Sequence, residues 1–196
     1  YEAAANLGDP HAAYRLGLRL RDEPKFGAIQ KDIANWFRIA ADAKIPAAQL
    51  SLAHYLADPE NDEVFNEKGA LRYYTLAAEA GKSQAQMVVA KWLDMGKAAV
   101  KDPVSALRYY EMAAKAGIPD GQYMMGLRLM AGVHLEKNAA LAIRYFEEAA
   151  RGGSVAALGE LGKAFYLAEG VDKDIQRAAD LLRRAAAEKD SEANYH

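Results

Sequence analysis

The 196-residue chain contains no cysteine, which excludes a disulfide framework and any metal site built on thiolates. This absence assigns no compartment, because a chain without thiols suits the cytosol and an oxidising space equally. No apolar run approaches the roughly 20 residues that a membrane-spanning helix needs, and no export signal is visible. We expect a segment of a longer protein, because the chain opens at Tyr1 inside a helical pattern and stops at His196 as another begins.

Neither sign of charge dominates the sequence. The 25 Lys and Arg residues are offset by 27 Asp and Glu residues, which leaves a net charge of -2. A nucleic-acid-binding domain is normally basic, with its Lys and Arg clustered on one face. Here the basic residues are spread along the whole chain, so we expect no nucleic-acid partner.

Signatures of catalysis and of metal binding are also missing. The four histidines are far apart in the sequence, and none belongs to a short metal-ligand motif such as His-Glu-x-x-His. There is no Gly-x-Ser-x-Gly elbow of the kind that presents a nucleophilic serine. The acidic run that begins at Asp58 has Glu63 where a calcium-binding loop needs glycine, so a solvated loop is the better interpretation. We expect no catalytic residue, no metal and no cofactor.

What the sequence does contain is a repeat of about 36 residues. An Ala-Ala pair recurs, and its second alanine falls at positions 5, 41, 78, 114, 150 and 186, in steps of 36, 37, 36, 36 and 36. A period held over the whole chain is typical of a solenoid built from one supersecondary unit. We predict one repeat solenoid over residues 1–196. It comprises the end of a preceding helix (1–8), repeats at about 9–44, 45–81, 82–117, 118–153 and 154–189, and the start of a further helix (190–196).

Each repeat contains two helical patterns, helix A and helix B, and nothing is typical of a strand. Helix A is predicted to begin at Pro10, Pro46 and Pro119, because proline is favoured in a first helical turn. Helix B is predicted to follow the N-cap residues Asn66, Asp102, Asn138 and Asp174. It should end in a left-handed residue, for which glycine is favoured. That position holds Gly8, Gly81, Gly117 and Gly153, while Lys44 and Lys189 replace the glycine.

These residues carry a resemblance to the Sel1-like repeat, a family of helix-turn-helix solenoids related to tetratricopeptide repeats. The clearest copies are 113–133 and 149–174, the latter with Leu161-Gly162, Gly170-Val171 and Lys173-Asp174. The resemblance implies an all-α fold, a right-handed α/α superhelical solenoid. It also implies a non-enzymatic scaffold or adaptor, an origin in bacteria, and a protein or peptide partner. Both the cytoplasm and the bacterial periplasm are compatible with it. Some relatives linked to β-lactam binding or hydrolysis are cysteine-rich, and this chain departs from them.

The resemblance also implies a concave groove lined by the outward face of helix A. Two positions per repeat should face it: the second residue after the recurrent small residue, and the residue after the Leu-Gly-type pair. With neighbouring positions, the candidate partner-binding residues are Tyr14, Leu18, Leu50, His54, Met87, Lys91, Tyr123, Leu127, Met130, Lys163 and Tyr166. Exposed apolar side chains grouped on one surface usually mark an interaction site, and such a groove suits an extended peptide or a partner helix.

Three alternatives stay open at this point. Some of these side chains, above all those of the first row (Tyr14, Leu50, Met87 and Tyr123), could pack against the preceding hairpin instead of facing a partner. The chain could be a small-ligand binder or a hydrolase acting on cell-wall-type compounds, which would require a deep pocket with convergent polar groups. It could also be a self-associating structural element, since an exposed terminal hairpin invites stacking.

Overall fold

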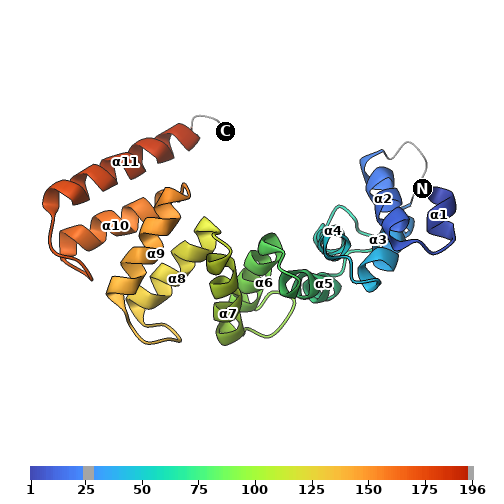
Figure 1. Ribbon diagram of the computed structural model, residues 1–196, viewed down its shortest axis with the longest axis horizontal. Helices are drawn as coiled ribbons and strands as arrows, with labels where there is room; N and C mark the ends of the chain where they lie inside the picture. Colours follow the sequence, from blue (N-terminus) through green and yellow to red (C-terminus); the bar gives the residue numbers. More distant parts are fainter. Residues whose placement is uncertain (24–28, 194–196) are drawn as a thin grey trace. The chain divides into compact units, whose positions relative to one another are not determined.

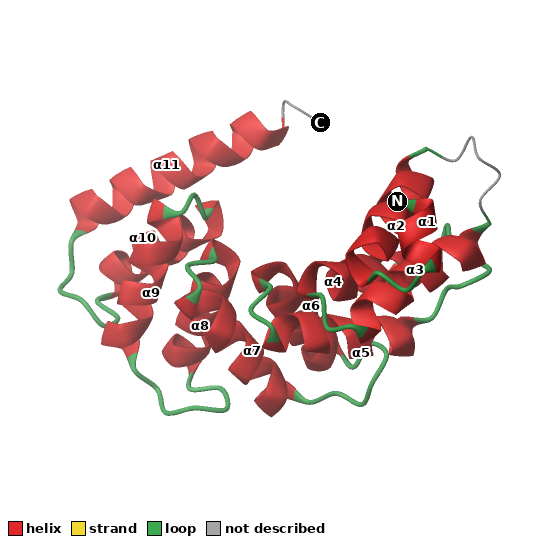
Figure 2. Cartoon of the chain, turned by 45° about the vertical axis from the view of Figure 1, so that its right-hand side comes forward, coloured by secondary structure: helices red, strands yellow, loops and turns green. Residues whose placement is uncertain are grey.

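The computed structural model describes residues 1–23 and 29–193, and over these residues it is all-helical with no strand (Figure 2). This confirms the predicted fold class. The helices are α1 (Glu2–Asn6), α2 (Pro10–Asp22), α3 (Gln30–Asp42), α4 (Pro46–Ala57), α5 (Glu67–Glu79), α6 (Ser83–Met95), α7 (Pro103–Lys115), α8 (Pro119–Ala131), α9 (Ala139–Arg151), α10 (Val155–Leu167) and α11 (Ile175–Ala193). The even-numbered helices are the predicted A helices, and the odd-numbered ones from α3 onward are the B helices.

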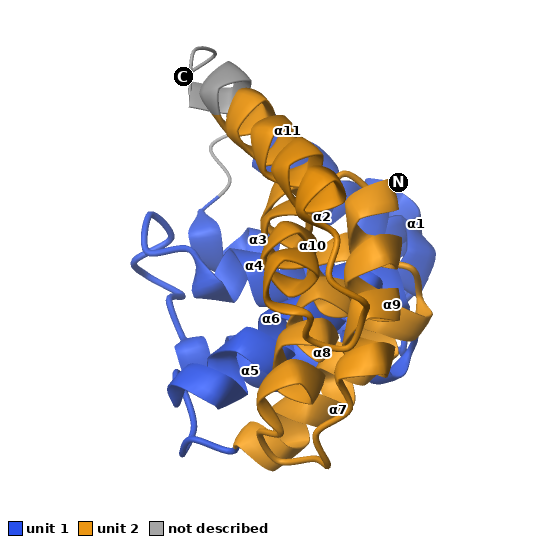
Figure 3. Cartoon of the chain, turned by 90° about the vertical axis from the view of Figure 1, so that its left-hand side faces the viewer, with its two compact units in different colours: residues 1–102 blue, residues 103–196 orange. Residues whose placement is uncertain are grey.

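The chain forms two compact units, unit 1 (Tyr1–Asp102) and unit 2 (Pro103–His196), coloured separately in Figure 3. In unit 1, each helix from α1 to α5 packs on the helix that follows it in the sequence. The helices from α7 to α11 do the same in unit 2 (Figure 1). Packing between sequence neighbours is the hallmark of a repeat array, and each unit follows it.

A large helix-B side chain seated against a glycine of helix A holds each of two hairpins together. Phe37 of α3 and Phe146 of α9 are almost completely buried, at 0% and 1% exposure. A Cβ atom added at Gly17 of α2 would lie 2.8 Å from the Phe37 ring, and one added at Gly126 of α8 would lie 2.5 Å from the Phe146 ring. The glycines are therefore required for the close approach of the two helices, because any larger residue would overpack the contact.

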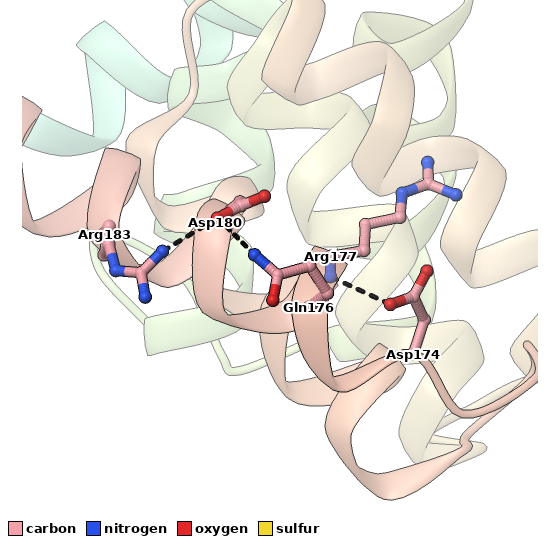
Figure 4. A network of polar contacts seen from close by, with 5 residues as sticks. All are labelled: Asp174, Gln176, Arg177, Asp180 and Arg183. Atoms are coloured by element: carbon pink, nitrogen blue, oxygen red, sulfur yellow. Dashed lines mark hydrogen bonds and ion pairs between the residues drawn. The ribbon is translucent and has the colours of Figure 1, made fainter.

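The predicted helix starts agree with the structure. The side-chain oxygens of Asn66 and Asn138 accept hydrogen bonds from the backbone N–H groups of Gly69 and Leu141, at 2.9 and 3.0 Å. Asp174 does the same for the N–H of Arg177 at 2.9 Å, at the start of α11 (Figure 4). These bonds satisfy backbone donors that have no partner within the helix.

The two lysines that replace glycine after helix B behave differently. Lys44 adopts the left-handed conformation, with φ of 61°, and α3 ends just before it. Lys189 does not, because α11 continues through it to Ala193, so the turn predicted at Lys189 and the new helix after it are not seen. The residues that come after each lysine in the sequence explain the difference. Pro46 keeps the residue before it out of the helical region, whereas Lys189 is followed by neither proline nor glycine and the chain favours continued helix.

Candidate functional site

All five residues predicted for unit 2 lie on its A helices, α8 and α10. We define the α8–α10 face as Tyr123, Leu127 and Met130 of α8 with Lys163 and Tyr166 of α10. The three α8 residues are half-buried and pack on one core cluster that includes Phe146, Ala157 and Leu161. Their spacings of four and three residues place them along one side of the helix. Tyr166 is 55% exposed, and the Lys163 side chain is exposed too.

Tyr123 contacts the hairpin core and lies near a charged pair on α10. Its ring lies 6.0 Å from the ring of Phe146, so one side of the side chain belongs to the hairpin core. Burial raises the pKa of its hydroxyl, and the negative charge of Glu160 adds to this effect while Lys163 opposes it. Glu160 and Lys163 form an ion pair of 2.7 Å on α10. The phenol of α8 thus lies within electrostatic reach of a charged pair on α10.

The corresponding surface of unit 1 is the α2–α4 face, which we define as Tyr14, Leu18, Leu50 and His54. The hydroxyl oxygen of Tyr14 lies 3.2 Å from the hydroxyl oxygen of Ser51, a hydrogen bond that joins α2 to α4. The Tyr14 ring also lies 6.1 Å from the ring of Phe37. Tyr14, Leu18 and Leu50 are half-buried, so this face is shallow, and each of these side chains has a packing role besides its outward edge.

His54 is the exposed residue of the α2–α4 face. Its Nδ1 atom lies 2.8 Å from the hydroxyl oxygen of Tyr74, a buried side chain of α5. Burial is the main cause that lowers the pKa of the His54 imidazole, and the positive charge of Arg21 lowers it further. The ring is therefore held in its neutral form more strongly than an ordinary surface histidine.

Met87 is a correction to the predicted set. Its side chain is only 7% exposed, so it belongs to the core of unit 1 and offers little surface to a partner. The residues predicted to face the groove lie at the edge of the buried side of helix A. The same repeat position is therefore buried in one repeat, as at Met87, and half-buried in another. Lys91, one turn further along α6, is exposed as predicted.

A row of buried glutamines was not predicted from the sequence. The side-chain amides of Gln49 and Gln86 donate to the backbone carbonyls of Ala41 and Ala78, at 3.4 and 3.2 Å. These carbonyls lie at the end of the preceding helix B, where they have no partner within the helix. The signal was present, because glutamine stands at positions 49, 86 and 122, in the same period as the Ala-Ala pairs. In unit 2, Gln122 donates to the Glu148 carboxylate at 3.2 Å instead.

An open hollow in unit 2 lies between α9, α10 and the start of α11, with a volume of about 890 Å³. The Arg177 guanidinium lies over the Phe165 ring at 4.1 Å and pairs with the Glu147 carboxylate at 3.3 Å. Arg177 is thus already held by two neighbours. The deep pocket with convergent polar groups that a small-ligand site needs is not found here.

Two further observations bear on chemistry. Among residues 1–23 and 29–193, no group of three or more His, Asp or Glu side chains is placed to hold a metal ion. None of the helices in this part of the chain has the length and apolar character that a membrane span requires.

Comparisons with known proteins agree with the repeat pattern. The family model for the Sel1 repeat matches residues 10–44, 46–82, 83–118, 119–154 and 155–190. A comparison with curated protein sequences found no match.

Solved structures give the same picture. The chain is similar to a protective antigen of uropathogenic Escherichia coli strains that displays an SLR fold, with a TM-score of 0.80 and 25% identity over 94% of this chain. It spans 39% of that antigen's length. It also resembles a Sel1 repeat protein from Oxalobacter formigenes, with a TM-score of 0.79 and 23% identity over 92% of this chain and 74% of the other. Cysteine rich protein B of Helicobacter pylori matches less closely, with a TM-score of 0.52 and 26% identity over 69% of this chain and 98% of the other.

The matched repeats follow one another from residue 10 to residue 190 with a single residue between the first two. Their boundaries fall where the helix pairs begin and end. The chain belongs to the Sel1 repeat family.

Proposed function

We propose that the protein is a non-enzymatic scaffold that holds a peptide or a helix of a partner protein on the outward faces of its A helices. Sel1 repeat proteins are generally protein-interaction scaffolds and are typically non-catalytic. The observation that supports the proposal for this chain is the α8–α10 face. There, the exposed Lys163 lies within electrostatic reach of the half-buried Tyr123, which packs on the hairpin core, and the exposed Tyr166 lies one turn further along α10.

The chemistry of this face favours a protein ligand. Tyrosine and methionine are enriched at protein interfaces, and an aromatic side chain can contribute much contact area for little conformational entropy. The Glu160–Lys163 pair lies beside the apolar residues and can fix the orientation of a polar group on the partner. A shallow surface of this kind suits an extended peptide or one side of a helix.

The experiment is capture of binding proteins from a lysate of the source organism, followed by affinity measurement with the protein that is retained. The test variant is Lys163→Ala with Tyr166→Ala, because both side chains are exposed and their removal leaves the core intact. Replacing Tyr123 or Met130 with aspartate would be a less suitable test of binding, because both residues pack on the core. The matched control is Arg144→Ala with Arg151→Ala, two exposed residues of α9.

We expect the test variant to weaken binding at least tenfold, because an aromatic hot-spot residue contributes about 2 kcal/mol or more to an interface. The control should bind like the original protein. If both variants bind equally, the partner does not use the α8–α10 face, and the proposal is wrong in that respect. Retention of no protein by any of them would count against the scaffold function itself.

A further inference from the structure

An exposed histidine and a buried tyrosine are joined in unit 1. The Nδ1 atom of His54 lies 2.8 Å from the hydroxyl oxygen of Tyr74, and the two rings meet edge to face at 5.2 Å. Tyr74 is 3% exposed, and its ring makes a second edge-to-face contact with Trp92 of α6 at 5.4 Å. The three rings connect the α2–α4 face to the core between α5 and α6.

The environment decides which group carries the proton. Burial raises the pKa of Tyr74 to about 12, so the phenol keeps its proton at neutral pH. A buried O–H group requires an acceptor, and the Nδ1 atom of His54 is the acceptor that the structure places beside it. Nδ1 therefore carries no proton, and the neutral imidazole carries its proton on Nε2.

Protonation of His54 reverses this bond. The second proton must go to Nδ1, which then becomes a donor, so the phenol oxygen must accept. The phenol proton then has to turn away from the imidazole, in a ring that already contacts Trp92 edge to face at 5.4 Å. Arg21 of α2 places a like charge near the imidazole. Arg21 is itself paired with the Asp22 carboxylate at 2.8 Å, and from α5 the hydroxyl of Tyr74 faces the imidazole.

We propose that His54 and Tyr74 form a pH-sensitive switch in the α2–α4 face. Acidification reverses their hydrogen bond, disturbs the contact between Tyr74 and Trp92, and adds a positive charge to the face beside Arg21. Because His54 is exposed, the proton can exchange with solvent without opening the hairpin. A partner that offers acidic side chains to this face binds more tightly in the protonated state. This last step rests on the proposed function, since it concerns regulation of the same kind of surface.

The first test is an NMR titration of the His54 ring in the complete 196-residue chain and in Tyr74→Phe. Phenylalanine fits this site, because Phe37 and Phe146 occupy the equivalent position in other hairpins. In the original protein the midpoint should lie below the ordinary value of 6.5. In Tyr74→Phe the midpoint of His54 should rise. This variant has no phenol O–H group that would lose its acceptor when His54 is protonated. An unchanged or lower midpoint in Tyr74→Phe would mean that burial alone acts on His54, and the switch would be refuted.

The second test follows the core. The chain has two tryptophans, so Trp36→Phe leaves Trp92 as the only one. Its fluorescence should change with pH at the midpoint measured for His54, and the change should be absent when His54→Gln is added. A Trp92 signal that stays flat through the His54 titration would show that the core does not respond. Neither test needs a partner, so failure of the switch and failure of the proposed function are distinguishable.

Discussion

The hairpin α2–α3 of unit 1 and the hairpin α8–α9 of unit 2 are built on the same internal contacts. Tyr14 meets Phe37 at 6.1 Å and 51°, and Tyr123 meets Phe146 at 6.0 Å and 45°. Each phenylalanine rests on a glycine of the preceding helix. The outer row differs, because Arg21 stands where the other hairpin has Met130. The shared contacts fix the hairpin, and the positions that vary between the two give each face its own chemistry.

The largest expected effect comes from removing the shared phenylalanine. Phe37→Ala and Phe146→Ala should each lower the free energy of unfolding by about 3–5 kcal/mol, because both rings are fully enclosed. Urea denaturation followed by circular dichroism would measure this. Leu182→Ala is the control, since Leu182 occupies the same repeat position but is 42% exposed, and it should cost clearly less. Very different losses for the two phenylalanines would show that the hairpins are not equivalent.

Next in size is the glycine beneath the ring. Gly126→Ala should destabilise the protein by about 1–3 kcal/mol, because the new methyl group would overlap the Phe146 ring. Gly159→Ala is the matched control on α10, where an added Cβ meets nothing within 4 Å. It should stabilise the helix by up to about 1 kcal/mol, since alanine favours the helix more than glycine. Thermal melts of both variants would test the pair. If both variants change the melting temperature equally, Gly126 is not in close contact with the Phe146 ring.

The residue that follows helix B differs between the two hairpins and can be exchanged. Lys44 ends the first with φ of 61°, and Gly153 ends the other with φ of 92°. Lys44→Gly should raise the free energy of unfolding by about 1 kcal/mol, because it removes the strain of a left-handed side-chain-bearing residue. Gly153→Lys should lower it by a similar amount. Chemical denaturation of the two single variants and of the double exchange would test this. The prediction requires that the two single variants change the free energy of unfolding in opposite directions.

The smallest effect is a dependence on pH. Leu18 and Leu127 stand in the two compared hairpins where α4 has His54. Because the pKa of His54 is lowered by burial, the unfolded chain binds its proton more readily than the folded protein does. Stability is therefore full above the ordinary value of 6.5 and falls as pH drops toward the lowered pKa. His54→Leu should remove this contribution, so melting temperatures at pH 7.5 and pH 5.5 should differ less in the variant. A difference as large as in the original protein would exclude His54 as its source.

Much of the fold could be predicted from the sequence because its signals are local. Pro46 and Pro119 mark helix starts, Asn66 and Asn138 cap helices, and the Ala-Ala period places each B helix. Lys189 could not be judged in this way, because the same residue type ends a helix at Lys44 and lies within one in α11. What decides between them is the proline that follows Lys44.

The candidate site was harder to predict. The period identified the outward row of helix A, but it could not separate Met87, which is buried, from Lys163, which is exposed. That distinction depends on how closely the next helix approaches, and it is set by side chains from another repeat. The pairing of His54 with Tyr74 joins residues 20 positions apart, and no sequence motif announces it.

The glutamine bonds have a consequence for how such a chain can change length. Gln49 reaches the carbonyl of Ala41, and Gln86 reaches that of Ala78, in both cases eight residues back along the chain. Excising residues 45–81 would bring Gln86 eight residues after Ala41, so the same bond could form across the new junction. A loss or duplication of about 36 codons thus leaves this bond with a chemically suitable partner. Recombination between repeats in the gene can therefore shorten or lengthen the protein in whole hairpins, and with them the number of faces it offers to partners.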